Sequence, residues 1–275
     1  MPSSEKSISH PKICFLIGFD RSGSSMISRV LAQHPKVNLL FHPFNSTEVT
    51  QTQWEYWQPK ENHQDTFQFQ KKMTEGILDK EYIKSDWFFN YSKSPEIKPD
   101  ELNLIKDTKF HFKIDWLQEN FPEIEVFGIW RDPRDILCSL VRNDFHRLWY
   151  ANLNVELLRR ICSTIQPLAK YNPLTGNSLQ QYEAMALGIA MRTEMLMARI
   201  KKRNWLVYEE IIAEPDVHLN EFTARFGLSR FDFKDLINKD YNVVGEKFER
   251  TGQWKSFFSQ AEKERINRIF QFILK

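Results

Sequence analysis

The sequence predicts an α/β fold with a central parallel sheet of about five strands flanked by helices. Several short apolar runs show no alternation of polar and apolar residues, which is typical of strands buried on both faces. Stretches of helical periodicity separate these runs, and such a succession indicates parallel strands joined by crossover helices. The expected strands are residues 13–19, 37–41, 102–106, 125–130 and 205–208.

The expected helices follow from apolar residues that recur every three or four positions between the strands. The first follows residues 20–25 and stops at the His34-Pro35 pair. A later one begins at Pro133, a residue that fits a first helical turn, with Asp132 as its cap. The remaining helices are expected over residues 113–120, 179–203, 214–227 and 261–275.

The length allows one large α/β domain or at most two smaller ones, and we expect a single domain over residues 1–275. Residues 46–100 combine many aromatic with many acidic side chains and show no strand periodicity. We expect them, together with residues 145–178, to be insertions that lie over the ends of the strands.

The charge balance and the cysteines limit the class of partner and the compartment. Thirty-eight basic and 36 acidic residues give a net charge of +2, which indicates neither a nucleic acid nor a membrane surface as partner. Residues 1–11 are polar, and no apolar run is long enough for membrane insertion. Three cysteines without a CxxC pair favour buried thiols in a reducing compartment. We therefore expect a cytoplasmic protein.

A loop of small residues, DRSGSS at 20–25, joins the first strand to the first helix. Such a strand–loop–helix unit binds anions, because backbone N–H groups and the positive end of the helix dipole face the turn. Gly23 would let the backbone approach a phosphate closely. The side-chain donors of this P-loop-like core would be the hydroxyls of Ser22, Ser24 and Ser25.

The loop departs from the usual nucleoside-triphosphate pattern. Gly18 and Gly23 have the expected spacing, but Ser24 stands where that pattern needs lysine, and the cation is Arg21. A guanidinium fork suits a terminal monophosphate. The alternative is a strand-to-helix turn that binds nothing.

A second basic turn, RDPRD at 131–135, follows the fourth strand. Ligands of open parallel sheets bind at the carboxyl ends of the strands. The turns at these ends are therefore expected to converge on one crevice, and they follow Phe19, Phe41, Lys106, Trp130 and Tyr208.

Four segments together resemble the sulfotransferases that use 3′-phosphoadenosine 5′-phosphosulfate. In chain order they are FDRSGSS (19–25), RDPRDILCS (131–139), VYEEIIAEPDVHLNEFTARFGL (207–228) and RTGQWKSFF (250–258). The resemblance covers most of the chain except the two insertions. It implies a transferase that moves a sulfonyl group from this donor to a small-molecule acceptor, with 3′,5′-adenosine bisphosphate as product.

The resemblance also implies roles for particular residues. The 5′-phosphate would be held by Arg21, Ser22, Gly23, Ser24 and Ser25, and the 3′-phosphate by Arg131 and Ser139. Tyr208 would contact adenine, or else be a core tyrosine. The residues Arg250, Thr251 and Gly252 resemble a shortened 3′-phosphate loop. For Arg131 the alternative is a salt bridge with Asp132 or Asp135, and Arg134 is expected to be structural.

The expected catalytic base is His42. Many family members carry Glu at the end of the second strand, where this chain has His42; others use His after the third strand, where it has Lys106, Asp107 and Thr108. A histidine suits proton abstraction near neutral pH. Asp107 and His111 are alternative bases, and the alternative role of His42 is that of a strand-end residue held by a backbone hydrogen bond. Arg21 and Lys106 would act on the leaving-group side.

The composition of residues 46–100 bears on the chemical class of the acceptor, and two other functions are possible for the same loop. Aromatic and acidic residues in 46–100 favour a polar, guanidinium-bearing acceptor, as in natural-product tailoring, although they are equally typical of a core with a solvated acidic face. No metal-ligand spacing is present in the sequence, so no metal is expected. The alternatives are a nucleotide-dependent kinase and a non-catalytic nucleotide-binding protein. The sequence indicates no oligomeric state.

Overall fold

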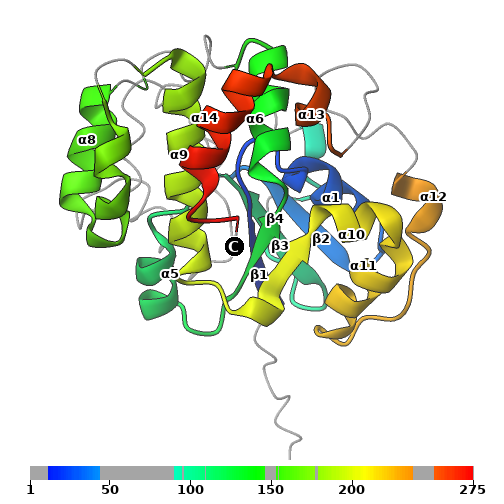
Figure 1. The fold of residues 1–275 in the computed structure, drawn as a ribbon. Coiled ribbons are helices and arrows are strands. Elements are labelled where there is room, and N and C mark those ends of the chain that lie inside the picture. The colour runs from blue at the N-terminus through cyan, green and yellow to red at the C-terminus, as the bar shows by residue number, and fades with distance from the viewer. Residues whose placement is uncertain are drawn as a thin grey trace, which may run out of the picture.

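The computed structural model describes residues 12–43, 90–94, 96–108, 110–145, 153, 155–176, 179–237 and 251–274. Within them lies a five-stranded sheet in the order β2-β3-β1-β4-β5, with every neighbouring pair parallel (Figure 1). The strands are β1 (Lys12–Ile17), β2 (Val37–Phe41), β3 (Leu102–Asp107), β4 (Glu125–Trp130) and β5 (Trp205–Val207). The predicted fold class is confirmed.

The strands are mainly apolar and almost wholly buried, as expected of a sheet covered on both faces; the buried polar exceptions are Asn38 in β2 and Asn103, Lys106 and Asp107 in β3. Strand β1 is central and pairs with β3 on one side and β4 on the other. It ends at Ile17, two residues earlier than predicted, because Gly18 and Phe19 already belong to the loop that follows.

The helices expected from the sequence lie close to their predicted positions, but the helix over Tyr208–Ala213 was not expected, since Tyr208 was predicted to end the fifth strand. The observed helices are α1 (Ser24–Leu31), α5 (Ile114–Asn120), α6 (Pro133–Arg142), α8 (Val155–Thr164), α9 (Gln181–Met197), α10 (Tyr208–Ala213), α11 (Pro215–Ala224), α12 (Lys234–Ile237), α13 (Trp254–Phe257) and α14 (Gln260–Phe270), with 3-10 helices η2 (Gln166–Leu174) and η3 (Lys202–Asn204). The helix predicted over residues 179–203 is shorter than expected: α9 begins at Gln181 and ends at Met197.

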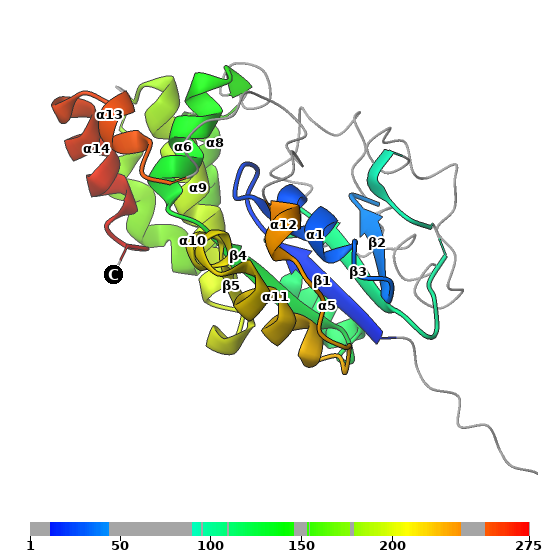
Figure 2. The ribbon, with the colours of Figure 1, turned by 90° about the vertical axis from the view of Figure 1, so that its right-hand side faces the viewer.

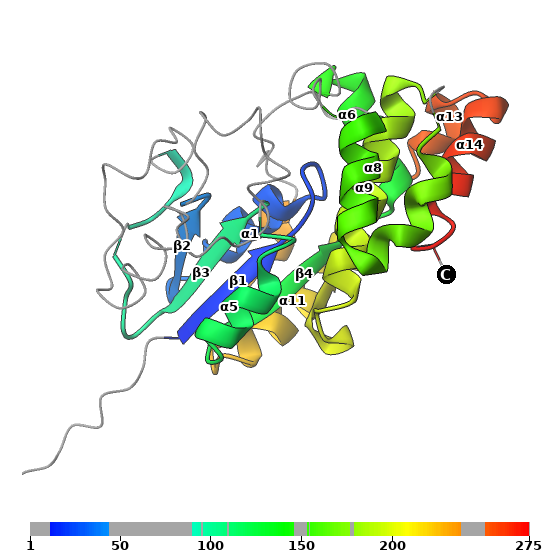
Figure 3. The ribbon, with the colours of Figure 1, turned by 90° about the vertical axis from the view of Figure 1, so that its left-hand side faces the viewer.

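Helices cover both faces of the sheet. Helices α1, α10 and α11 pack on the face to which Cys14 and Leu16 point, whereas α5 packs against Phe15 and Ile17 (Figures 2 and 3). A third apolar cluster joins α6, α8, α9 and α14 beside the β4 side of the sheet. Helices α8 and η2 account for most of the expected insertion at 145–178, whereas most of the stretch 46–100 lies outside the described residues.

None of the helices in the described ranges is both long and apolar enough to cross a lipid bilayer.

The cysteines are expected to resist alkylation in the folded protein. Cys14, Cys138 and Cys162 are buried free thiols. Burial raises the pKa of Cys138 and of Cys162 to about 11, and it also raises the pKa of Cys14. At pH 8, only about 0.1% of a thiol with such a pKa is thiolate, the reactive form.

Intact-protein mass spectrometry after brief treatment with iodoacetamide at pH 8 is therefore expected to show no added carbamidomethyl group. The same treatment in guanidinium chloride should modify all three thiols and serves as the control. Rapid modification of the folded protein would contradict the burial of these side chains.

Candidate functional site

The sheet has its topological switch at β1. The chain leaves β1 for β2 on one side of the sheet, returns through β3, and then crosses to β4 and β5 on the other side. Ligands of open parallel sheets bind at the carboxyl ends of the strands at such a point. Here the loop after β1 lies between the turns after β3 and β4.

The loop after β1 is a tight turn that delivers the chain into α1. Ser22 N donates a hydrogen bond to Phe19 O at 3.0 Å, and Arg21 and Gly23 have positive φ angles of 68° and 88°. Among the described residues, no side chain caps the amino end of α1, and its first turn holds no acidic residue. The helix therefore offers uncapped N–H groups and a positive dipole end to an anion.

The hydroxyl of Ser22 lies inside this turn. The side chain is fully buried, and its Oγ has no hydrogen-bond partner within the described ranges. A Cβ atom at Gly18 would lie 2.4 Å from this oxygen, so residue 18 must be glycine for the turn to close. Buried hydroxyls normally have partners, so an unsatisfied one beside an uncapped helix is consistent with a ligand-binding loop.

The backbone of Gly23 lies directly against the ring of Tyr208, the first residue of α10. A Cβ atom at Gly23 would lie 2.3 Å from two carbons of this ring, so only glycine permits the contact. Tyr208 is 5% exposed and belongs to the apolar cluster on the α1 face. The ring is thus a core side chain that also packs against the loop after β1.

The two predicted phosphate corners adjoin each other. Arg21 Nε donates to Ser139 Oγ at 3.0 Å, and Arg131 Nη1 donates to Arg21 O at 2.8 Å. The Arg131 guanidinium also lies 4.6 Å from the centre of the Tyr208 ring. Burial first, and the positive charge of Arg131 second, lower the pKa of the Arg21 guanidinium. A bound anion would relieve this repulsion.

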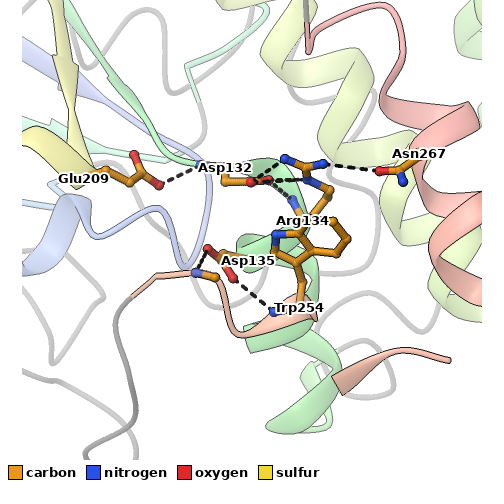
Figure 4. A network of polar contacts seen from close by, with 7 residues as sticks. Asp132, Arg134, Asp135, Glu209, Trp254 and Asn267 are labelled. Atoms are coloured by element: carbon orange, nitrogen blue, oxygen red, sulfur yellow. Dashed lines mark hydrogen bonds and ion pairs between the residues drawn. The ribbon is translucent and has the colours of Figure 1, made fainter. Parts of the chain in front are cut away.

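The two carboxylates that are the alternative partners of Arg131, those of Asp132 and Asp135, each have other partners. Asp132 accepts from Arg134 Nε at 2.9 Å and from Arg134 Nη2 at 2.7 Å (Figure 4). Arg134 also lies over the ring of Trp254, at 4.1 Å from its centroid. Arg134 is therefore structural, as expected.

Asp135 ties the last basic segment to the second turn. It is 2% exposed and accepts hydrogen bonds from the backbone N–H groups of Gly252 at 2.6 Å and Trp254 at 3.2 Å (Figure 4). Thr251 and Gly252 accordingly lie next to the start of α6. Arg250, the residue predicted to reach the phosphate, lies outside the described residues.

His42 and Lys106 form a second corner on the other side of β1. His42 N donates to Lys106 O at 2.8 Å, and Lys106 Nζ contacts His42 Nε2. Lys106 is 1% exposed, and its ammonium lies 4.7 Å from the centre of the Phe41 ring. His42 makes the backbone hydrogen bond that is expected of a strand-end residue. The His42 ring also contacts Lys106, which is another predicted catalytic side chain.

Arg192 of α9 is the residue of this region that the sequence reasoning missed. Its fully buried guanidinium contacts Thr108 O and His111 Nδ1, the latter at 2.9 Å, and lies 3.8 Å from Asp20 Oδ2. The signal was a single arginine within a long helix that is otherwise rich in Met, Ala and Leu.

Asp107, one of the alternative bases, is buried at the end of β3, two positions beyond Ile105.

In the described part of the chain, no group of three or more His, Cys, Asp and Glu side chains is arranged to hold a metal ion.

Comparison with known proteins gives a family match and several distant structural matches. The profile of the sulfotransferase family matches residues 13–232. The chain matches no curated protein sequence.

Three of the similar solved structures are sulfotransferases or their domains. A sulfotransferase from Alicyclobacillus acidocaldarius is 15% identical, with a TM-score of 0.43 and coverage of 95% of this chain and 96% of the other. The sulfotransferase domain from the curacin biosynthetic pathway is 16% identical, with a TM-score of 0.49 and coverage of 96% and 99%. The sulfotransferase domain of the Synechococcus PCC 7002 olefin synthase is 14% identical, with a TM-score of 0.47 and coverage of 100% and 99%.

Proposed function

The chain belongs to the sulfotransferase family, and on that premise we propose that it transfers a sulfonyl group from 3′-phosphoadenosine 5′-phosphosulfate to an O–H or N–H group of a small molecule. One observation carries the choice of donor. Two arginines and one serine are joined by hydrogen bonds beside the uncapped amino end of α1: Arg21 from the loop after β1, Arg131 from the turn after β4 and Ser139 from α6. A ligand with two phosphate groups matches this concentration of positive charge and donors.

The residues present fit such a donor. The loop after β1 supplies the N–H groups of α1, the hydroxyls of Ser24 and Ser25, and the buried Ser22 hydroxyl for the 5′-phosphate. Arg131 and Ser139 supply a guanidinium and a hydroxyl for the 3′-phosphate. The ring of Tyr208 stands between these corners, against Gly23 and beneath Arg131, where an adenine base would meet it. Thr251 and Gly252 border the same corner.

The chemistry required of the protein is largely positioning and charge stabilisation, as in phosphoryl transfer. When bound, the donor supplies the sulfonyl group and a phosphate leaving group. His42 accepts the proton of the acceptor as the new bond to sulfur forms. Arg21 and Lys106 stabilise the negative charge on the bridging oxygen. Because Lys106 contacts the His42 ring, the proton carrier and the leaving-group cation are held in one hydrogen-bonded pair.

The remaining parts of the proposal rest on the sequence. The acceptor is a polar molecule that bears a guanidinium group, as in natural-product tailoring, and residues 46–100 and 145–178 of the single domain 1–275 border it. Aromatic faces and carboxylates in the first of these stretches suit a cation. The protein acts in the cytoplasm, without a metal and without a nucleic acid partner.

Calorimetric titration with 3′,5′-adenosine bisphosphate tests the proposed function. We expect saturable binding of this product and weaker binding of ATP–Mg²⁺. Tighter binding of ATP–Mg²⁺ would favour a kinase instead. Binding of the bisphosphate without turnover of any acceptor, in a screen for the mass of one added sulfonyl group, would favour a non-catalytic binding protein.

Replacing Ser139 with alanine is expected to weaken binding of the bisphosphate selectively. A lost hydrogen bond to a charged phosphate corresponds to a roughly 10- to 100-fold weaker Kd. Adenosine 5′-monophosphate lacks the 3′-phosphate, so its affinity should change by no more than about threefold, even though Ser139 also accepts a bond from Arg21. Calorimetry with both nucleotides measures the difference.

The matched control is Ser163→Ala, on the exposed side of α8, where the hydroxyl bonds only to Arg159 O of its own helix. This variant should bind both nucleotides like the wild type. An equal loss of affinity for the two nucleotides in Ser139→Ala would show that Ser139 does not distinguish the 3′-phosphate.

A further inference from the structure

Arg192 combines complete burial with a full positive charge. It lies in α9, whose residues from Glu183 to Arg192 are all buried, and its own side chain has no exposed surface. A buried cation destabilises a fold unless it is paired and hydrogen-bonded. The groups that contact the Arg192 guanidinium therefore indicate the role of this buried charge.

The partners of Arg192 come from two loops at the carboxyl edge of the sheet. One loop precedes Arg21: the guanidinium lies 3.8 Å from Asp20 Oδ2 and 4.2 Å from the centre of the Phe19 ring. The other follows β3, where Arg192 Nη2 donates to Thr108 O and to His111 Nδ1. One side chain thus connects the loop that carries Arg21 to the turn that begins two residues after Lys106.

We infer that Arg192 is a positioning residue for the transfer reaction. It holds Asp20, and through it the adjacent Arg21, at a fixed place relative to the end of β3, where Lys106 stands. This inference rests on the proposed function, which gives Arg21 and Lys106 the same leaving group. A planar guanidinium suits the task because it donates in several fixed directions at once, which an ammonium group does not.

Arg192 also determines the protonation form of His111. A guanidinium has only donors, so Nδ1 of His111 must present its lone pair, and the ring proton is then on Nε2. In this form the Nδ1 lone pair of His111 faces Arg192.

Variants that remove one or both members of the Arg192–Asp20 pair separate positioning from stability. Arg192→Met leaves Asp20 without this cation and should lower the melting temperature. Adding Asp20→Asn removes the uncompensated charge and should restore part of that loss. If Arg192 positions Arg21, both variants should nevertheless bind the bisphosphate about ten-fold more weakly than the wild type.

Two further variants complete the design. Arg192→Lys keeps the charge and should still bind more weakly, because a lysine cannot join the two loops. Arg199→Met is the matched control: this arginine, just beyond the end of α9, pairs with Asp115 at 2.6 Å and should not affect affinity. Bisphosphate affinity like that of the wild type in the double variant would overturn the inference and make Arg192 a purely structural residue.

Nitrogen-15 NMR tests the inference without any ligand. The wild type should show the Nε2–H form of His111 and a hydrogen-bonded Arg21 Nε–H signal, and both should change in Arg192→Met but not in Arg199→Met. A proton on His111 Nδ1 in the wild type, or an Arg21 signal unchanged in Arg192→Met, would overturn it. If the wild type fails to bind the bisphosphate, the proposed function fails, while these spectra still decide the role of Arg192.

Discussion

Replacing Gly23 with alanine is expected to abolish detectable binding of the bisphosphate and to destabilise the protein by about 2–4 kcal/mol. Two effects combine at this position. The φ angle of 88° is strained for a residue with a Cβ atom, and that atom would lie 2.3 Å from the ring of Tyr208. Either the ring or the loop must move, and both form the proposed nucleotide site. Calorimetry and urea unfolding measure the two losses.

Gly227→Ala is the matched control for this prediction. Gly227 has a similar φ angle of 70°, but a Cβ atom there would meet only Lys12 Nζ, at 3.7 Å. This variant should lose about 1–2 kcal/mol from backbone strain and bind the bisphosphate normally. Equal effects in the two alanine variants would show that the contact between Gly23 and Tyr208 does not shape the site.

Replacing His42 with glutamine is expected to lower kcat by about 10²- to 10⁴-fold, the usual contribution of a general base. Glutamine keeps a hydrogen-bond acceptor for the buried ammonium of Lys106 but takes up no proton near neutral pH. The affinity for the bisphosphate should therefore stay within about twofold, because no nucleotide contact is removed. Steady-state kinetics with an acceptor from the mass screen, together with calorimetry, measure both quantities.

His218→Gln is the control, because this half-buried histidine of α11 faces Glu210 at 3.9 Å and touches none of the proposed site residues. It should turn over like the wild type. His42→Ala extends the test: normal nucleotide binding with normal turnover would end the assignment of His42 as base. Asp107, buried at the end of β3, would then be the next residue to replace.

The sequence was sufficient for the elements and for their order, because both are encoded locally. Short, mainly apolar runs marked all five strands, and Pro133 after Asp132 marked the start of α6, where Asp132 does accept from Arg134 N. Boundaries were less certain: the end of α9 at Met197 is followed by no glycine or proline that would have marked it. The two turns proposed to bind phosphate were recognisable because small and basic residues are concentrated in them.

The pairing of side chains across the site had no local signal. Arg21 and Ser139 are 118 residues apart, and His42 and Lys106 are 64 apart. Their meeting depends on the order of the strands, because the same turns after strands in another order would lie farther apart along the carboxyl edge of the sheet. Arg192 illustrates this most clearly, since periodicity gives only a buried position on a helix.

By itself, the sequence determined an α/β chain with a loop of small residues and one arginine after its first strand and a basic turn after its fourth. Only the tertiary structure decided that β1 stands between β3 and β4, and hence that Arg21 meets Arg131 on one side while Asp20 meets Arg192 on the other. The physical reason is that hydrophobic periodicity specifies which face of an element is buried, whereas the partner of a buried charge is fixed only when distant segments pack together.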